Sequence, residues 1–194
     1  MRGSLLGQLM VTMITLLLAA WPLTAGETVR EVLPAQLDAK VMDVVFSGGE
    51  TMHYSVHWSG GVKIGDIHLQ IAKDKSQADS FIILARIKDY GPLAVFYPVD
   101  DTFSCSVTGP LKLPVLYEVH QKEGYGRDIR RTTWYDQDKR LVRYRKNTEG
   151  EQQFPVEGSV YNEFASFVIT RVLKLQDDTP IVVPTFADRK RHEV

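Results

Sequence analysis

Histidines offer the first candidate chemistry in this sequence. His53 and His57 stand four residues apart, a spacing that lets two imidazoles grip one metal ion when both lie on a helix. Residues 51–58 alternate between apolar and polar types, however, which predicts a strand. On a strand the two side chains lie about 13 Å apart, at ~3.3 Å per residue, which is too far to share an ion. This pair is therefore not a predicted metal site.

A second histidine pair depends on the register of the following strand. If a hairpin places Tyr54 opposite Ile67, then His53 faces His68 with their Cβ atoms about 5 Å apart. With Asp66 or Ser55 nearby, such a pair could contribute to a zinc site, but zinc usually takes at least three protein ligands. Two solvent-facing polar histidines are the commoner arrangement. We predict no metal site and no cofactor.

Basic side chains crowd one predicted hairpin. They are Arg127, Arg130, Arg131, Lys139, Arg140, Arg143, Arg145 and Lys146. Such a patch suits phosphate or carboxylate groups, as on anionic lipid head groups or envelope polysaccharide. The alternative is a solvated face that is balanced by Asp128, Asp136, Asp138 and Glu149. The candidate ligand-binding residues from this hairpin are Arg130, Arg131, Arg143 and Arg145.

The register of this hairpin follows from its predicted turn at residues 136–139. Pairing Tyr135 with the residue just after that turn sets Arg130 opposite Arg145, where like charges repel and an anionic partner would relieve them. Arg131 then lies opposite Tyr144, whose ring could take a cation–π contact.

Aromatic side chains of the predicted strands are the third candidate. A small barrel fills its interior with such residues, whereas a half-open one leaves a cavity for an apolar ligand. Core packing is the commoner role. The candidate ligand-binding residues are Tyr54, Trp58, Phe103 and Tyr117, from an inventory that also holds Phe81, Phe96 and Trp134.

No set of residues in the chain forms a recognisable catalytic group. Adjacent acids such as Asp100 and Asp101 point to opposite faces of a strand, and there is no glycine-rich phosphate loop, serine elbow or HExxH. Cys105, the only cysteine, alternates with Phe103 and Val107, so we expect a small buried apolar side chain and no disulfide. We predict no catalytic residue and favour a protein that is not an enzyme.

The first 25 residues are typical of a secretory signal peptide. Arg2 precedes an apolar run over residues 9–23, and small residues lead up to Ala25, where we expect cleavage. The alternative is a retained anchor, but the apolar run is short for a spanning helix. We therefore expect an exported protein of the periplasm or cell envelope with no transmembrane span in its mature form.

Composition narrows the class of partner. Removing residues 1–25 leaves 22 basic side chains against 24 acidic ones, a net charge of about −2. Nucleic-acid binding usually requires a basic domain or stripe, so we predict no nucleic-acid partner. About 170 residues remain, which suits one domain with a sizeable core. Nothing in the sequence determines an oligomeric state.

The chain beyond residue 45 predicts a mainly β domain. Strands are expected at residues 51–58, 66–71, 81–87, 102–107, 115–119, 127–135 and 140–146. Regularly spaced short strands of this kind predict an antiparallel curved sheet or a half-open barrel. Residues 26–45 are expected to form an extended lead-in, because Pro34 argues against a long helix.

One segment carries a helical pattern instead. Residues 162–175 place apolar side chains three and four positions apart, with Asn162 as the N-cap and Glu163 at the positive end of the helix dipole. Near the end, residues 181–183 and 189–194 look like the beginnings of two further strands. An unpaired edge would remain there, so either nearby charges protect it or the natural chain continues.

Three segments resemble one known family. Residues 46–58, 97–101 and 161–171 occur in the order and spacing of the "domain of unknown function 3108" (DUF3108) family, although the family commonly shows Asp where this chain has Glu163. The resemblance implies a β-rich exported protein of a bacterial envelope with no established activity. It also implies further strands beyond Val194 and assigns no catalytic residue.

Two functions are compatible with these observations. The first is a non-enzymatic binding or carrier module that holds a lipid-like or other amphiphilic ligand within the curved sheet beneath the helix. Lipid and amphiphile carriers of the envelope have this combination of features, an analogy at the level of the fold. The second is a structural or interaction protein of the envelope that binds anionic polysaccharide or a protein partner through the basic hairpin.

Overall fold

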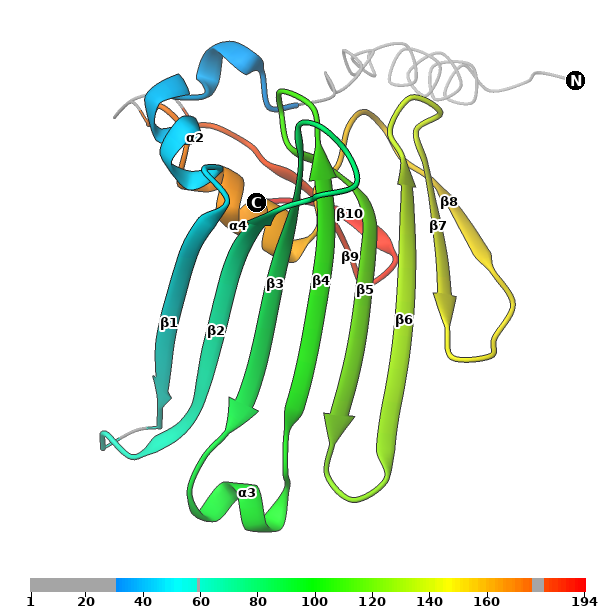
Figure 1. The fold of residues 1–194 in the computed structure, drawn as a ribbon. Coiled ribbons are helices and arrows are strands. Elements are labelled where there is room, and N and C mark those ends of the chain that lie inside the picture. Colours follow the sequence, from blue (N-terminus) through cyan, green and yellow to red (C-terminus); the bar gives the residue numbers. More distant parts are fainter. Residues whose placement is uncertain (1–30, 59, 176–179) are drawn as a thin grey trace, which may run out of the picture.

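The chain forms one large antiparallel sheet in which each strand pairs with its neighbours in sequence (Figure 1). The structure is a computed structural model that describes residues 31–58, 60–175 and 180–194. The strands of this sheet are β1 (Gly49–His57), β2 (Lys63–Lys73), β3 (Ser80–Asp89), β4 (Asp100–Thr108), β5 (Leu113–Glu123), β6 (Arg127–Asp136), β7 (Leu141–Lys146) and β8 (Gln152–Pro155). The sheet is open, with β1 and β8 at its edges, so the predicted curved sheet is confirmed and a closed barrel is not formed.

The two faces of the sheet have different surroundings. The helix α4 (Glu163–Thr170) and the hairpin of β9 (Pro184–Ala187) and β10 (Lys190–Glu193) pack on one face, which we call the inner face. Side chains alternate between the faces, so Met52, Leu69 and Ala85 lie on the inner face while His53 and His68 lie on the other, outer face. The core lies between α4 and the inner face, where Ile71, Ile83, Cys105, Val107 and Val168 are at most 1% exposed.

Asn162 begins α4 as predicted. Its Oδ1 accepts a hydrogen bond from the backbone N–H of Ala165 at 2.7 Å, and its Nδ2 donates to Sγ of Cys105 at 3.0 Å. The helix ends at Thr170, earlier than the predicted 162–175. It ends there because the chain tightens into i→i+3 bonds and then forms a β-bridge between Leu173 and Leu37.

Several short elements were missed or predicted differently. The 26–45 segment was expected to be extended, but η1 (Pro34–Gln36) and α2 (Ala39–Val45) lie within it, and Asp38 caps α2 through the N–H groups of Lys40 and Val41. The predicted signal peptide lies outside the described residues. The strand β8 and the one-turn helix α3 (Pro92–Phe96) were not predicted.

The two C-terminal strands pair with each other rather than ending as an open edge of the main sheet. Ala187 lies opposite Lys190, and Glu193 lies opposite Pro184. Phe186 of β9 packs on the rings of Tyr135 and Phe154, with centroid separations of 6.3 and 5.6 Å. This small hairpin therefore covers the inner face over the later strands.

The register predicted for the basic hairpin is wrong by one residue on each strand. Asp136 pairs with Leu141, so Thr133, and not Arg131, lies opposite Tyr144. The cause is the position of the turn, which takes residues 137–140 rather than 136–139: Asp136 stays in β6 and accepts from the backbone N–H of Lys139, and Arg140 takes a φ of 52°. Left-handed backbone is uncommon for arginine, so the residue type did not signal this turn.

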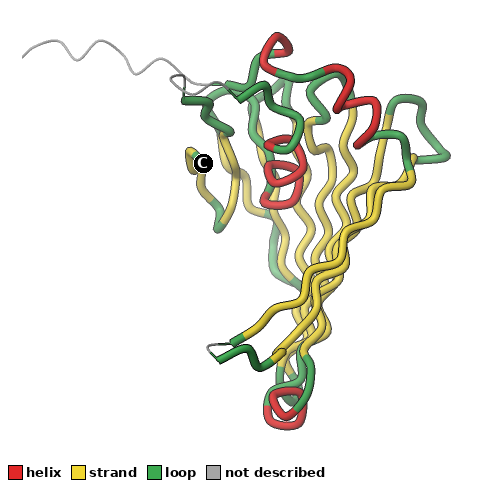
Figure 2. The backbone as a smooth tube through the Cα atoms, turned by 90° about the vertical axis from the view of Figure 1, so that its left-hand side faces the viewer, coloured by secondary structure: helices red, strands yellow, loops and turns green. Residues whose placement is uncertain are grey.

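Only half of the sheet is covered. In Figure 2 the helices η1, α2 and α4 and the β9–β10 hairpin gather at one end, while the other half of the long strands extends as a single layer. Helix α3 and the loops that join β1 to β2 and β5 to β6 lie at this bare end (Figure 1). Any binding surface on the bare half therefore consists of sheet side chains and these loops.

Replacing Asn162 with alanine should destabilise the fold by about 2 kcal/mol, since it removes a helix cap and a buried hydrogen bond. Urea unfolding followed by circular dichroism measures this change. The matched control is Asp38→Ala, which removes an exposed cap from α2 and should lower the free energy of unfolding by about 1 kcal/mol or less. Equal losses in the two variants would contradict a special role for the buried asparagine.

Candidate functional site

A groove of about 830 Å³ crosses the outer face at right angles to six strands. It runs between two rows of side chains that the strand register places side by side. One row is mostly neutral and polar: Thr51, Gln70, Leu84, Ser104, Glu118 and Thr132. The other row is rich in imidazole and guanidinium groups: His53, His68, Arg86, Thr102, His120 and Arg130.

The basic row of this groove is paired with acids on the same face. Arg86 makes a bidentate contact with Asp100, with N···O distances of 2.8 and 2.7 Å. His120 contacts Asp128 at 2.9 Å, and the same carboxylate lies 3.9 Å from Arg130. The Arg86 guanidinium lowers the pKa of Asp100. The groove is therefore a nearly balanced charged surface rather than an unpaired cationic site.

The predicted juxtaposition of His53 and His68 is confirmed. Tyr54 lies opposite Ile67, and the two imidazole rings stack with their centroids 4.2 Å apart. Nε2 of His53 lies 2.7 Å from Oδ1 of Asp66, which also accepts from the Ser55 hydroxyl at 3.2 Å. Among the described residues, no group of three His, Cys, Asp or Glu side chains is arranged to hold a metal ion.

Asp66 accepts the hydrogen bonds that surround the pair of His53 and His68. Lys63 approaches its Oδ2 to 2.8 Å, and this hydrogen bond, with those from His53 and Ser55, lowers the pKa of Asp66 to about 2. The carboxylate therefore stays ionised well into acid and orders the charged residues at this edge of the outer face.

On the inner face an apolar strip continues beyond α4. Tyr54 of β1 meets Phe167 of α4 edge to face, with centroids 6.2 Å apart, and the two residues are 42% and 41% exposed. Below them lie Val56, Ile67 and Ile87, which are only partly buried. Phe167 is the α4 residue that meets this strip, and α4 does not cover the side chains beyond it. The strip therefore lies on the bare half of the sheet.

Polar side chains border the strip on β4 to β6. Gln121 donates to Asp101 at 3.0 Å and accepts from Nη2 of Arg131 at 2.5 Å. Burial raises the pKa of Asp101, although the hydrogen bonds from Gln121 and the backbone of Lys122 oppose this. Nε of Arg131 is buried and has no hydrogen-bond partner among the described residues.

A second cleft, of about 260 Å³, adjoins Arg131 between the sheet and the start of α4. Tyr117, Tyr144, Lys146 and Glu163 are among its lining residues. Glu163 opens to solvent through the cleft, yet the surrounding protein partly desolvates its carboxyl group and raises its pKa. This cleft offers both charges, so it has no clear preference for a cation or an anion.

The predicted ligand-binding residues divide between different surfaces. Tyr54, Phe103 and Tyr117 share the inner face, where Phe103 and Tyr117 pack on Phe164 and Tyr117 is buried in the core. Trp58 lies beyond them at the bare end and is 69% exposed.

The four predicted arginines do not form one patch. Arg131 points to the inner face, whereas Arg130, Arg143 and Arg145 lie on the outer face. Arg143 and Arg145 both lie over the ring of Trp134, at 5.4 and 5.1 Å, instead of the contact predicted for Arg131 with Tyr144. Glu151 lies 3.6 Å from Arg143, which supports the interpretation of this hairpin as a balanced, solvated face.

Two features could not be predicted from the sequence because they depend on several strands at once. The outer groove arises from the register of six strands. The alternation of residue types shows which face a side chain lies on, but the turn lengths decide which side chains stand next to one another across the strands. The position of Gln121 and Arg131 beside the apolar strip also could not be predicted, because it depends on hydrogen bonds between strands, from Gln121 to Asp101 and from Arg131 to Gln121. Cys105 is fully buried as expected, and burial raises its pKa to about 12, which favours the protonated thiol at neutral pH.

Comparison with known proteins identifies the family. The family described as "Protein of unknown function (DUF3108)" matches residues 53–194, about three quarters of the chain, so this chain belongs to that family. The comparisons with curated proteins and with solved structures give no match. No helix among the described residues has the length and apolar character needed to cross a membrane.

Acid should destabilise the wild-type protein partly through Asp66. Its pKa is near 3.8 when unfolded and about 2 when folded, so its stabilising effect is complete above about pH 4 and is lost as the pH falls towards 2. In Asp66→Asn we expect lower stability at neutral pH and a shallower loss of stability between pH 4 and 2. Thermal unfolding at a series of pH values measures both.

The control for this experiment is Asp138→Asn, on the exposed turn between β6 and β7. Its stability should change with pH as that of the wild type does. A wild-type slope in Asp66→Asn would show that the charged cluster around His53 does not depend on this carboxylate.

Proposed function

We propose that this protein is a non-enzymatic binding module that holds an amphiphilic, lipid-like ligand on the inner face of its sheet, beside α4. One observation carries the proposal: the half-exposed pair of Tyr54 and Phe167, which opens onto the partly exposed apolar strip of the bare half. Exposed apolar surface of this kind is favourable to cover, at roughly 25 cal/mol per Å² removed from water.

The polar border of the strip supports an amphiphile rather than a purely apolar ligand. Four strand spacings of ~4.8 Å separate Tyr54 on β1 from Gln121 on β5, or about 19 Å. An extended apolar chain laid across β1 to β3 would therefore bring a polar head towards Gln121 and Arg131. The guanidinium of Arg131, which also lines the cleft beside α4, could donate to a carboxylate, phosphate or carbonyl oxygen of that head.

Export to the periplasm or envelope is part of this proposal. It rests on the basic start, apolar run and small-residue exit within residues 1–25. N-terminal sequencing of the protein from a periplasmic fraction tests it, and the expected first residue is Gly26. Recovery of the chain from the cytosol with residues 1–25 intact would overturn it.

The alternative role, envelope binding through the basic hairpin, has less support. Arg143 faces Glu151, Lys139 pairs with Asp136 at 2.8 Å, and Arg127 pairs with Glu123 at 2.8 Å. These neighbours neutralise most of the charge that an anionic polysaccharide would need.

Titration with an anionic naphthalene dye tests the amphiphile site through the rise in dye fluorescence. We expect saturable binding by the folded protein at one site. Removing both half-exposed rings in Tyr54→Ala/Phe167→Ala should weaken binding roughly thirtyfold, since each ring contributes ~1 kcal/mol of contact.

The matched control for this titration is Leu84→Ala, because Leu84 is a similarly exposed apolar residue on the outer face, at 39%. It should bind the dye as the wild type does. Absence of saturable binding, or equal weakening in Leu84→Ala, would contradict a ligand site on the inner face.

A further inference from the structure

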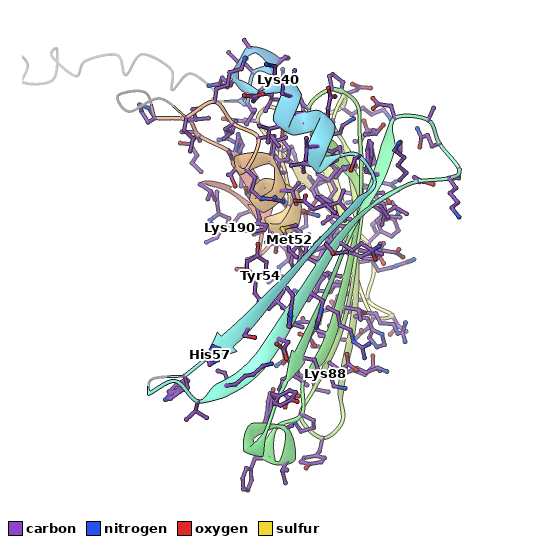
Figure 3. The ribbon with its side chains drawn as sticks, turned by 60° about the vertical axis from the view of Figure 1, so that its left-hand side comes forward. Lys40, Met52, Tyr54, His57, Lys88 and Lys190 are labelled. Carbon is purple, nitrogen blue, oxygen red and sulfur yellow. The ribbon has the colours of Figure 1, made fainter. Side chains whose placement is uncertain are left out.

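The bare end of the sheet carries a cluster of exposed apolar side chains. We call this cluster the tip patch; its members are Trp58, Val62, Tyr90, Val95, Phe96, Tyr97 and Tyr125, which are 46–82% exposed. They come from the β1–β2 loop, the β3–β4 connection with α3, and the β5–β6 loop, which all lie at the same end (Figure 1). Figure 3 shows α3 projecting beyond the strand ends, past Lys88.

Hydrogen bonds hold these loops in a fixed arrangement. The backbone N–H of Trp58 donates to Val62, and that of Tyr90 donates to Ile64, both at 2.8 Å. Between loops, the Tyr125 hydroxyl donates to the carbonyl of Val95, so the β5–β6 loop is tied to α3. The exposure of the rings is thus a property of an ordered surface.

The hydroxyl groups of Tyr97 and Tyr125 are hydrogen-bonded within the protein. The Tyr97 hydroxyl donates to Glu123 at 3.3 Å, and Nζ of Lys63 lies 4.7 Å over the ring of Tyr90. Ring carbons are therefore what this end presents outward, together with the side chains of Trp58 and Phe96. Exposed apolar patches on an ordered surface mark sites of interaction.

The chemistry of the tip patch fits a lipid bilayer surface. Trp and Tyr are enriched at membrane interfaces, where an amphipathic ring sits at the level of the head groups. Lys88 and Lys122 lie one residue from the ends of β3 and β5, and neither makes an ion pair with a described residue. They alternate with Asp66, Asp100 and Asp128 across the neighbouring strands, so a belt of both charges lies behind the apolar rings and can meet both the phosphate and the ammonium groups of lipid heads. A convex projection also inserts into head groups more readily than it buries area against another folded surface.

We propose that the tip patch docks this protein on a lipid bilayer, with the rings of Trp58, Phe96 and Tyr125 among the head groups. The surface is separate from the ligand site beside α4 and does not depend on it. Val56 and Ile87 nevertheless connect the two, because the inner-face strip begins at the tip and ends at Tyr54 and Phe167.

Flotation of the purified full chain with vesicles of phosphatidylethanolamine and phosphatidylglycerol tests the proposal. We expect Trp58→Ala/Phe96→Ala/Tyr125→Ala to bind vesicles at least tenfold more weakly than the wild type. The matched control is Leu33→Ala/Val44→Ala/Leu175→Ala, which removes apolar side chains that are 56–76% exposed away from the tip. Any binding through residues 1–25 is common to all three proteins, and the control should float as the wild type does.

Depth is measured by fluorescence with brominated lipids. The quenching that disappears in Trp58→Phe reports contact of that ring with lipid, whatever the other tryptophans contribute. In Lys88→Gln/Lys122→Gln the acids of this belt are left unbalanced, so we expect weaker binding to anionic vesicles relative to neutral ones. Equal flotation of the tip variant and the wild type, or no quenching that depends on Trp58, would overturn the proposal.

Two further readouts separate bilayer docking from ligand binding and from self-association. The tip variant, Trp58→Ala/Phe96→Ala/Tyr125→Ala, should keep the naphthalene-dye affinity of the wild type. The proposal of bilayer docking and the proposal of a ligand site can therefore be contradicted independently of each other. Sedimentation velocity at increasing protein concentration tests a second copy as the occupant. Self-association that the tip variant abolishes, without vesicle binding, would show that the tip pairs with another copy and would overturn bilayer docking.

Discussion

The structure depends on how a single antiparallel sheet buries one of its faces when no second sheet of comparable size is present among the described residues. One eight-residue helix, α4, meets most of that need, and its position rests on a few contacts. Asn162 caps the helix and bonds Cys105 at the centre of the sheet, while Arg171 beyond its end makes a bidentate contact with Glu50 on the edge strand β1. These contacts hold the helix at both ends, so the core forms beneath it rather than along the whole length of the strands.

Partial coverage explains why the two halves of the sheet have different chemistry. Near α4 the inner-face side chains are buried and tightly packed, whereas the bare half of the sheet has to remain stable with water on both of its faces. On the outer face this is achieved with alternating charges, Asp66, Lys88, Asp100, Lys122 and Asp128 in neighbouring strands. On the inner face, apolar side chains remain only partly buried beside Gln121 and Arg131, and the proposal of a bound ligand rests on this exposed apolar surface.

Local patterns in the sequence predicted the strands well because period-two alternation is a local property. The β1–β2 register was also predictable, since Gly60 and Gly61 take positive φ values in a short turn. The β6–β7 register was not, because Arg140 adopts a left-handed conformation that its residue type does not favour. The end of α4 and the conformation of residues 36–37 could not be predicted, because both depend on the β-bridge between Leu37 and Leu173, which are far apart in the sequence. For the site, alternation separated Tyr54 from His53, but only the packed fold shows that Tyr117 is covered and Tyr54 is not.

The meander order of the strands also governs how the chain folds. Every pairing in the main sheet joins neighbours in sequence, so these contacts are local and form early with little loop-closure entropy. The contacts that complete the core are distant: Glu50 meets Arg171 across 121 residues, and Leu37 bridges Leu173. A nascent chain therefore presents a nearly complete sheet before its helix arrives. During that interval the face that α4 will bury is open to water, to chaperones and to other unfinished copies.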